Sequence, residues 1–298
     1  MEKVMFFIDS PCDLTREDIA GRPVRVNSAE VMYGGKCEKD IDVDRPSYYK
    51  YLVECKEVPN TAMATPEEWR EGFEEAYKAG YTHGVGMTIS TTASSVLQTA
   101  NVGREMFLSE RPGAMKITLI DSRAYSVVYG CVMQSALELN EKGASFAEIV
   151  EHIKFGLRRS HGIMCVYSLK CMKKSGRISG MSAFVGEALG IRPLLRVRDG
   201  VIEPVDKIRG DKGVTDKLVD YVAEHITHSE EQTLTILYGL VPEDDIDRLE
   251  RRLLERVPCK AVRRHTVGCA VATNCGPEVL AVQFYGKPYD TEIWTIED

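Results

Sequence analysis

The sequence lacks the features that mark secreted, membrane-spanning and zinc-binding proteins. Its 298 residues include nine cysteines but no CxxC pair, and the spacings Cys165/Cys171 and Cys269/Cys275 are too long for zinc knuckles. No apolar run approaches the roughly 18 residues of a membrane-spanning helix, and the run Val4–Ile8 is too short for a signal peptide. Unpaired cysteines without a secretion signal are typical of a reducing compartment. We therefore expect a cytoplasmic protein with neither a metal site nor a cofactor.

Common catalytic motifs are also missing. The sequence has no GxxxxGK[ST] loop for nucleotide phosphates and no GxSxG turn for a nucleophilic serine. His225 and His228 are three residues apart, but no carboxylate–histidine pattern accompanies them, so we expect no metal there. Internal repeats and low-complexity segments are absent, which indicates an ordinary globular protein.

Charge of one sign is concentrated in a single stretch. The chain has 38 Lys and Arg against 45 Asp and Glu, a net charge of −7, which argues against general nucleic-acid binding. Residues 158–212, however, hold 12 basic and 5 acidic side chains. Such a stretch suits a small anion or an acidic partner.

Strand and helix patterns alternate through the first half of the chain. They predict strands at 4–8, 24–26, 30–33, 84–89 and 117–120. They predict helices at 15–20, 47–55, 65–79, from 92 or 94 to 107, 125–141 and 145–159. This alternation is typical of βαβ units, so we expect an α/β domain with a parallel sheet over residues 1–160.

The second half mixes the two patterns less regularly. They predict strands at 164–167, 233–238, 261–265 and 279–284, and helices at 182–189, 213–226 and 243–256. Asp199-Gly200 is a two-residue turn signal between 194–197 and 201–205, which predicts a hairpin. We expect a second α/β domain over residues 161–298.

A cluster of hydroxyl side chains follows the strand at 84–89. Ser90-Thr91-Thr92-Ala93-Ser94-Ser95 lies where a strand passes into a helix. Hydroxyls and free backbone N–H groups at a helix N-terminus bind carboxylate or phosphate without a metal. The alternative is simple capping of the helix, which needs only one hydroxyl.

Two further segments carry candidate binding groups. In Lys173-Lys174-Ser175-Gly176-Arg177-Ile178 the Arg177 guanidinium could pair with a carboxylate, although a solvated basic loop has the same composition. Thr61 offers a hydroxyl from an extended loop between Pro59 and Pro66, although this is also an ordinary loop before a helix.

Six segments resemble, in the same order, motifs of the DegV family of fatty-acid-binding proteins. They are Asp9-Ser10-Pro11-Cys12-Asp13-Leu14 (D-S-x-x-D-L in the family), Pro59–Pro66 (P-x-T-S-Q-P-S-P), Ile89–Ala100 (I-S-S-x-L-S-G-T-Y-Q-S-A), Ile120-Asp121-Ser122 (a central D-S pair), Leu169–Ile178 (L-x-x-L-K-K-G-G-R-I) and Leu189–Leu195 (L-N-I-K-P-I-L). Asp199-Gly200 and Lys207–Gly210 continue the pattern. The resemblance covers nearly all of the sequence.

The resemblance implies an N-terminal Rossmann-like domain with a parallel sheet and a C-terminal α/β domain with a mixed sheet. It implies a long-chain fatty acid whose carboxylate lies between the domains. Thr61 and Ser94 would donate hydroxyl hydrogen bonds to it, the backbone N–H of Ser95 would add another, and Arg177 would supply the counter-charge. The family resemblance further implies a protein that is not itself an enzyme and that presents the ligand to a separate ATP-using kinase subunit.

The sequence departs from the family pattern near the implied site. Ala62, Met63 and Ala64 replace S-Q-P beside Thr61, and Asn274 stands where the family's T-H-x-G-P-G motif has histidine. Asparagine can hydrogen-bond a carboxylate but does not titrate near neutral pH. The apolar run Met181–Leu195 is a candidate wall for the acyl tail, with ordinary core packing as the alternative.

Two other functions are compatible with these residues. One is an acyl or phosphate hydrolase or transferase that uses the Ser90–Ser95 hydroxyls, with His83 or His161 as the base. The other is a small-anion sensor with a different ligand. For a kinase partner, the candidate surface consists of Lys207, Arg209 and Lys212, which are otherwise a solvated basic face.

Overall fold

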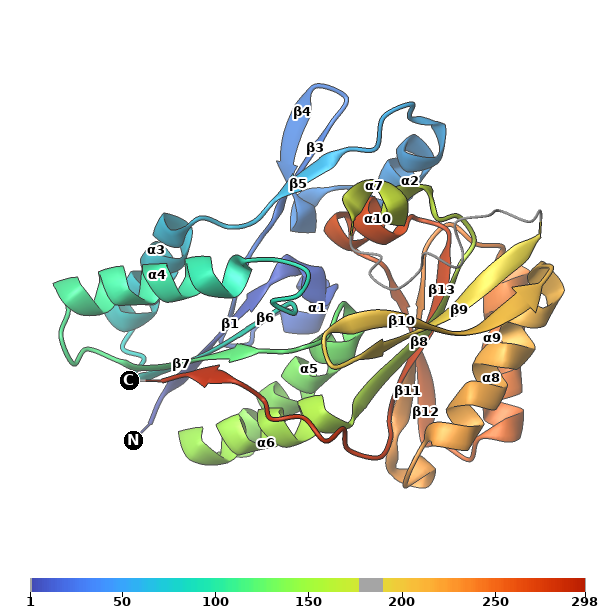
Figure 1. Cartoon of the computed structure of the whole chain (residues 1–298). Helices are drawn as coiled ribbons and strands as arrows, with labels where there is room; N and C mark the ends of the chain where they lie inside the picture. Colours follow the sequence, from blue (N-terminus) through green and yellow to red (C-terminus); the bar gives the residue numbers. More distant parts are fainter. Residues whose placement is uncertain (1, 177–189, 298) are drawn as a thin grey trace.

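The first domain is built on a five-stranded sheet. The protein is described by a computed structural model that covers residues 2–176 and 190–297 (Figure 1). The sheet has the order β14-β7-β6-β1-β2, and only β14 is antiparallel to its neighbour. Its strands are β1 (Val4–Asp9), β2 (Val24–Asn27), β6 (His83–Thr88), β7 (Lys116–Asp121) and β14 (Thr295–Ile296).

Helices cover both faces of this sheet. Two lie above it and two below it in Figure 1: α3 (Pro66–Lys78) and α4 (Val96–Glu110), then α5 (Val127–Glu141) and α6 (Phe146–Arg159). The short helix α1 (Arg16–Ile19) follows β1. The strand β1 is apolar because it is buried on both faces, and the Phe7 ring meets Phe73 of α3 at 4.7 Å. The sheet thereby forms the core of a three-layer domain.

A small antiparallel sheet projects from this domain. It has the order β4-β3-β5 and consists of β3 (Glu30–Tyr33), β4 (Lys36–Lys39) and β5 (Asn60–Ala62). Helix α2 (Arg45–Glu54) connects β4 to β5. The sequence patterns did not predict β4 or β5, because their residues, Lys-Cys-Glu-Lys and Asn-Thr-Ala, include few of the apolar side chains that mark a strand.

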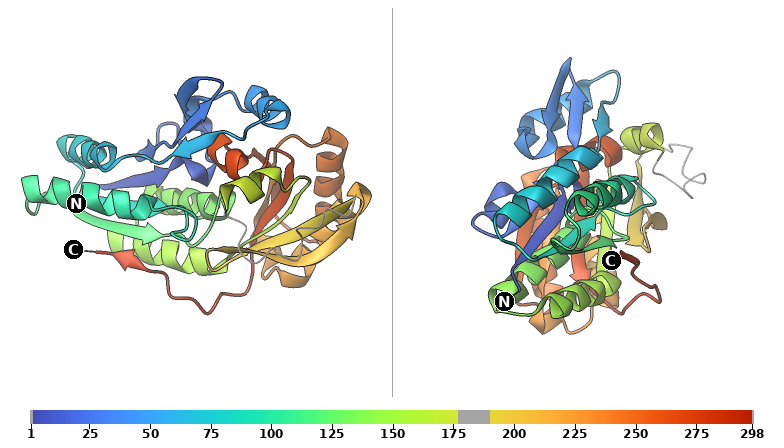
Figure 2. Two further views of the ribbon diagram at one scale, coloured as in Figure 1. Left: turned by 45° about the horizontal axis from the view of Figure 1, so that its top comes forward. Right: turned by 90° about the vertical axis from the view of Figure 1, so that its left-hand side faces the viewer.

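The second domain contains a six-stranded mixed sheet in the order β10-β9-β8-β13-β11-β12. Its strands are β8 (Ser160–Val166), β9 (Ile191–Arg198), β10 (Val201–Arg209), β11 (Thr233–Tyr238), β12 (Ala261–Thr266) and β13 (Val279–Tyr285). Helices α8 (Val214–His225) and α9 (Glu243–Arg256) cover its outer face (Figures 1 and 2). The inner face packs against the small sheet, α2, the start of α5 and a short helix, α10 (Cys269–Cys275).

The predicted two-domain α/β fold, with a parallel sheet followed by a mixed sheet, is confirmed. The prediction that a helix begins at 92 or 94 is wrong, because Ser90–Ser95 forms turns and α4 begins at Val96. The basic motif at 173–178 is not a loop up to Gly176: α7 (Lys170–Ser175) is helical, and Gly176 ends it at φ +70°. Helix α10 and strand β14 were not predicted, and the helix predicted at 182–189 lies outside the described residues.

The division at residue 160 stays a prediction. Helix α6 ends at Arg159 and β8 begins at Ser160, but β14 brings the C-terminal segment back to the first sheet. Both ends of the protein therefore lie at the same end of the molecule (Figure 2). Within the described ranges, no helix combines the length and apolar composition needed to cross a bilayer.

The turn between β9 and β10 joins the two domains. Three hydroxyls of the first domain converge on the Gly200 carbonyl: Tyr125 at 2.8 Å, Ser90 at 3.4 Å, and Thr92. On the preceding residue, the Asp199 carboxylate accepts a hydrogen bond from Arg123 Nε at 2.5 Å. A Cβ on Gly200 would lie 2.5 Å from Ser90 Oγ, so this approach requires glycine.

A second turn of the same shape provides a matched control for this contact. Gly34-Gly35 of the β3–β4 hairpin has φ angles of +53° and +78°, against +51° and +78° for Asp199-Gly200. A Cβ on Gly35 would meet nothing within 4 Å. We expect Gly35→Ala to cost about 1 kcal/mol of unfolding free energy through backbone strain alone. Gly200→Ala should cost roughly 2–4 kcal/mol, since the collision with Ser90 is added. Equal costs in urea denaturation would show that the turn does not hold the domains together.

Candidate functional site

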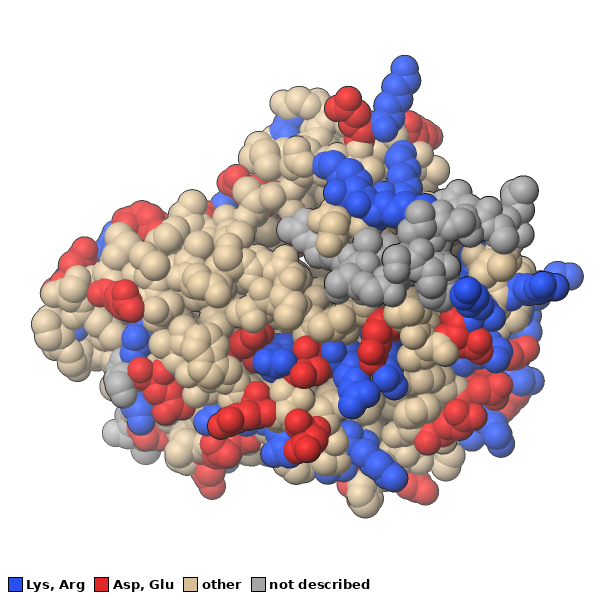
Figure 3. Space-filling model, in the orientation of Figure 1, with Lys and Arg blue, Asp and Glu red and all other residues tan. Residues whose placement is uncertain are grey.

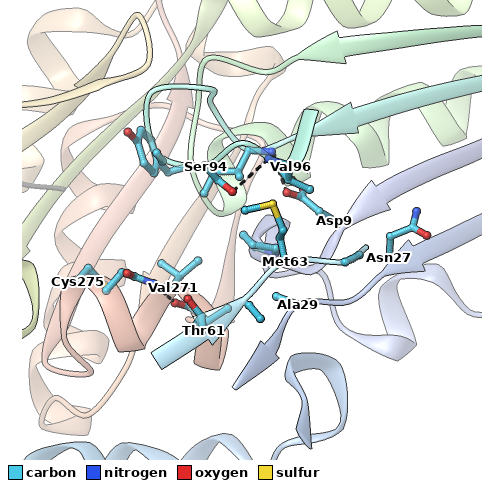
Figure 4. A pocket seen from close by; sticks show the side chains of 17 residues that line it. Asp9, Asn27, Ala29, Thr61, Met63, Ser94, Val96, Val271 and Cys275 are labelled. Carbon is cyan, nitrogen blue, oxygen red and sulfur yellow. Dashed lines mark hydrogen bonds between the residues drawn. The ribbon is translucent and has the colours of Figure 1, made fainter. Parts of the chain in front are cut away.

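A cavity lies where the strands β1, β2 and β6 end, beside the small sheet and α10. This edge of a parallel sheet is the usual ligand position in open α/β folds. Its polar side chains come from separate elements: Asp9, Asn27, Thr61 and Ser94, which are labelled in Figure 4, and Asn274. The fold therefore brings together three residues of the predicted site, Thr61, Ser94 and Asn274.

Thr61 is held at the cavity by backbone pairing and by a lysine. Strand β5 pairs with β3, which places Thr61 opposite Val31. Lys174 of α7 donates from Nζ to the carbonyls of Val58 and Pro59 at 2.9 and 3.2 Å, and to Asn60 Oδ1 at 2.8 Å. Lys174 therefore holds the segment before β5 in place, although its side chain is exposed. Among the described residues no partner bonds the Thr61 hydroxyl, which leaves it available to a ligand.

Only one hydroxyl of the Ser90–Ser95 cluster lines the cavity. Ser90 and Thr92 are engaged with Gly200, and Thr91 donates to Asp121 at 2.5 Å. Ser94 lines the cavity and accepts a hydrogen bond at 3.3 Å from the Val96 N–H, so its own proton is free to be donated. The expectation that the whole cluster binds an anion is replaced by a division of roles, with Ser94 facing the cavity.

Ser95 has a different environment from Ser94. It is exposed at the N-cap of α4, and its hydroxyl lies 3.6 Å from the Met63 sulfur. It is not among the residues that line the cavity. The role predicted for its backbone N–H stays a prediction.

Asn274 reaches the cavity from α10. Its Nδ2 donates to the Ala270 carbonyl at 2.8 Å, which orients the amide and leaves one N–H for a ligand. Asp40 accepts a hydrogen bond from the Ala270 N–H at 2.9 Å near the start of α10, and Ser175 of α7 donates to the Asn274 carbonyl at 3.2 Å. The helices α7 and α10 are therefore tied together beside Thr61.

The floor of the cavity contains a buried carboxyl group and a buried amide. Asp9 accepts hydrogen bonds from Tyr129 Oη at 2.7 Å and from the Ile89 N–H at 3.1 Å, yet burial raises its pKa to about 7. Burial also raises the pKa of Asp13 to about 7, against the opposing effect of Arg45. Asn27 is 4 % exposed, and no described residue bonds its amide nitrogen or oxygen. A polar ligand group or water must satisfy that amide.

A second, apolar cavity adjoins the polar one. Tyr125, Val271 and Cys275 line both. Beyond them the second cavity runs between the inner face of the mixed sheet and the start of α5, and most of its wall consists of aliphatic side chains from Val127, Val128, Ile163, Val197, Val279 and Ala281. The two cavities together provide a polar end and an apolar end for one elongated ligand.

Neither histidine proposed as a base lines either cavity. His83 begins β6 and Ser90 follows its far end, which separates them by roughly 20 Å of extended backbone. His161 stacks on Tyr289 at 4.3 Å and lines neither cavity, and burial lowers its pKa to about 4. In the described ranges, no group of three or more His, Cys, Asp or Glu side chains is arranged to hold a metal ion.

The remaining predicted residues lie away from the cavity or outside the description. Arg177 and most of Met181–Leu195 lie outside the described residues. Lys207, Arg209 and Lys212 are exposed at the end of β10 and the 3-10 turn Asp211–Gly213 that follows.

The stretch 158–212 does not form a single basic face. Over β9 and β10 acidic and basic side chains lie side by side (Figure 3), and Arg192 and Arg196 pair with Asp211 at 2.8 Å and Glu203 at 2.5 Å.

Sequence reasoning missed Asp9, Asn27, Tyr125 and the whole of α10 apart from Asn274. Asp9 and Asn27 end adjacent parallel strands, so the rule for strand carboxyl ends could have identified them. Tyr125 had no such signal, because its position depends on the hairpin of the other domain.

The fold and the site define a two-domain α/β protein with a ligand cavity that is polar at one end and apolar at the other. The sequence matches the family described as "Uncharacterised protein, DegV family" over residues 3–287. This chain belongs to the DegV family.

Relatives and solved structures agree with that assignment. A DegV domain-containing protein of Caldanaerobacter subterraneus is 28% identical over 288 residues, 96% of this chain and 100% of the relative. A fatty acid binding DegV family protein from Streptococcus agalactiae has a TM-score of 0.83 at 25% identity and covers 96% of this chain and 100% of its own. A DegV family protein from Thermus thermophilus, described by its fatty acid binding, has a TM-score of 0.85 at 24% identity, over 95% of this chain and 99% of its own.

The raised pKa of Asp9 predicts how stability depends on pH. A carboxyl group that titrates near 7 when folded and near 3.8 when unfolded binds more protons in the folded state between those values. The unfolding free energy should therefore fall as the pH rises from about 4 to about 7. Asp9→Asn should make this fall shallower in urea denaturation, and the exposed Asp220→Asn should not. If Asp9→Asn leaves the slope of the unfolding free energy against pH unchanged, groups other than Asp9 cause the fall.

Proposed function

We propose that this protein binds a long-chain fatty acid with its carboxylate at Thr61, Ser94 and Asn274 and its alkyl tail in the adjoining apolar cavity. One observation carries the proposal: hydrogen-bond donors from three elements meet at one end of a cavity whose other end is aliphatic. Solved relatives from Streptococcus agalactiae and Thermus thermophilus are described as binding fatty acids, which supports the same ligand class here.

The energetics of such a complex are favourable at both ends. A carboxylate leaving water requires hydrogen-bond donors, and the two hydroxyls and the Asn274 amide supply them. Each buried CH₂ of the alkyl tail contributes roughly 0.8 kcal/mol. A long tail therefore supplies most of the affinity, and the polar end fixes its orientation. Ser95 through its backbone N–H and Arg177 as counter-charge complete the proposed carboxylate site.

We further infer that the protein is a non-catalytic carrier that presents the bound carboxylate to a separate fatty acid kinase subunit. Neither candidate histidine lines the cavity, which argues against the hydrolase or transferase alternative. The exposed side chains Lys207, Arg209 and Lys212 are the proposed docking surface. All nine cysteines are free, which fits the reducing cytoplasm.

Removing both hydroxyls should weaken binding strongly. In Thr61→Ala/Ser94→Ala, two hydrogen bonds to a charged group are lost, so we expect the Kd for palmitate to rise roughly hundredfold. The matched control is Ser109→Ala, whose hydroxyl bonds the Met106 carbonyl within α4, the helix that follows Ser94, and which should leave the Kd unchanged. Titration calorimetry measures both. Wild-type affinity in the double variant would remove these residues from the site.

Charge reversal should separate ligand binding from presentation. Arg209→Glu lies outside the cavity, so its Kd for palmitate should match the wild type. The rate of acyl-phosphate formation by a fatty acid kinase subunit should fall roughly tenfold, since a charged contact at an interface is reversed. Arg251→Glu, on the exposed side of α9, is the control. If both variants support the same rate, the docking surface lies elsewhere.

A further inference from the structure

The apolar cavity contains one buried polar group that the binding of a plain alkyl tail does not use. Gln283 lies on β13, is 1 % exposed and lines that cavity. Its side chain shares the inner face of the strand with Val279 and Ala281, because side chains alternate along a strand. A glutamine therefore occupies the wall where an aliphatic residue is expected.

The orientation of the Gln283 amide is fixed by Ser160. The Ser160 hydroxyl has a single proton, which it donates to the Val128 carbonyl at 2.5 Å. Toward Gln283 it can only accept, so the group 3.1 Å away must be the amide nitrogen, Nε2. If the amide were reversed, Oε1 would face the Ser160 oxygen, and two hydrogen-bond acceptors would lie against each other. The oxygen, Oε1, must therefore face away from Ser160.

Oε1 has no hydrogen-bond donor among the described residues. A buried acceptor without a donor costs free energy, and proteins rarely retain one unless water or a ligand satisfies it. The missing group must be a donor, because Oε1 can only accept.

The position of Gln283 places that donor far from the carboxylate. Cys275, at the junction of the two cavities, ends α10 just before β13 begins at Val279. Gln283 lies four residues further along the strand, roughly 13 Å beyond Val279. The donor therefore belongs to the half of the ligand remote from its carboxyl end.

We propose that the ligand is a hydroxylated fatty acid whose hydroxyl group, in the distal half of the acyl tail, donates a hydrogen bond to Oε1 of Gln283. This inference rests on the proposed fatty-acid binding and specifies the ligand class. A plain tail leaves Oε1 unsatisfied or traps a water there. A hydroxylated tail satisfies the amide and its own hydroxyl in the same contact.

The test compares ligands that differ only in their hydroxyl. Delipidated wild-type protein is titrated with stearate, 10-hydroxystearate, 12-hydroxystearate and 2-hydroxystearate, and the titrations are repeated with Gln283→Met. We expect the wild type to bind at least one of the 10- and 12-hydroxy acids about tenfold more tightly than stearate. Gln283→Met should lose that preference and bind stearate no more weakly. The affinity for the 2-hydroxy acid, whose hydroxyl lies at the carboxyl end, should be the same in both proteins.

A second glutamine provides the matched control. Gln232 is also buried, but its amide is satisfied: Nε2 donates to the Tyr285 carbonyl at 2.8 Å, and Oε1 accepts from the Tyr285 N–H at 2.8 Å. It lines neither cavity, so Gln232→Met should keep the ligand preference while losing more thermal stability than Gln283→Met. Native mass spectrometry of the wild type with equimolar stearate and hydroxystearate gives the same comparison without any variant.

The outcomes separate the two proposals. Equal affinities of the wild type for stearate and for the 10- and 12-hydroxy acids would overturn the hydroxyl proposal and leave fatty-acid binding intact, with a water on Oε1. A preference that persists in Gln283→Met would also overturn it. Failure of the wild type to bind any of the four acids would overturn the proposed function itself.

Discussion

The contact between the β9–β10 turn and the loops after β6 and β7 determines the geometry of the site. One backbone carbonyl, that of Gly200, accepts hydroxyl hydrogen bonds from the other domain, and the absence of a Cβ lets Ser90 approach it. This contact fixes the turn segment that carries Ser94. It also fixes Tyr125, whose side chain lies where the polar and apolar cavities meet. The relative placement of the two ends of the ligand site therefore depends on a two-residue turn that touches neither end directly.

The polar end of the site combines donors for an anion with one buried carboxyl group. Thr61, Ser94 and Asn274 offer hydrogen bonds, while Asp9 contributes a carboxyl group to the same cavity. Burial raises the pKa of Asp9 to about 7, so near neutral pH a substantial fraction of it is uncharged. A ligand carboxylate would raise that pKa further, because like charges disfavour each other's ionised form. Neutral Asp9 and the proposed anionic ligand are thus mutually compatible, so the buried carboxyl group does not oppose the proposed binding.

Much of the fold could be predicted from local pattern. The buried strand β1, the capped helix α3 and the Asp199-Gly200 hairpin each have a strong signal within a few residues: continuous apolar side chains, a Thr65–Glu68 capping box and a two-residue turn. Strand β5 could not be predicted because Asn-Thr-Ala contains no apolar run, and helix α10 could not because seven residues are too few to show a helical period. Thr61 was a candidate from its loop and Asn274 from the family resemblance, and nothing in their neighbouring residues showed that they would face one cavity.

By itself the sequence determined the chemistry that is available: where hydroxyls follow strands, which glycines permit turns, and that no cysteine pair or phosphate loop is present. Only the tertiary structure decided how that chemistry is divided. Of the hydroxyls between Ser90 and Ser95, those of Ser90 and Thr92 donate to Gly200 at the domain contact, and that of Thr91 donates to Asp121. Ser94 lines the cavity. Similarly, the sequence shows Gln283 only as one polar residue in an apolar strand. The tertiary structure adds that Ser160 orients its amide so that Oε1 faces away from Ser160. The physical reason is that a hydrogen-bonding group has few donors and acceptors, and which of them remain free depends on partners that are distant in the sequence.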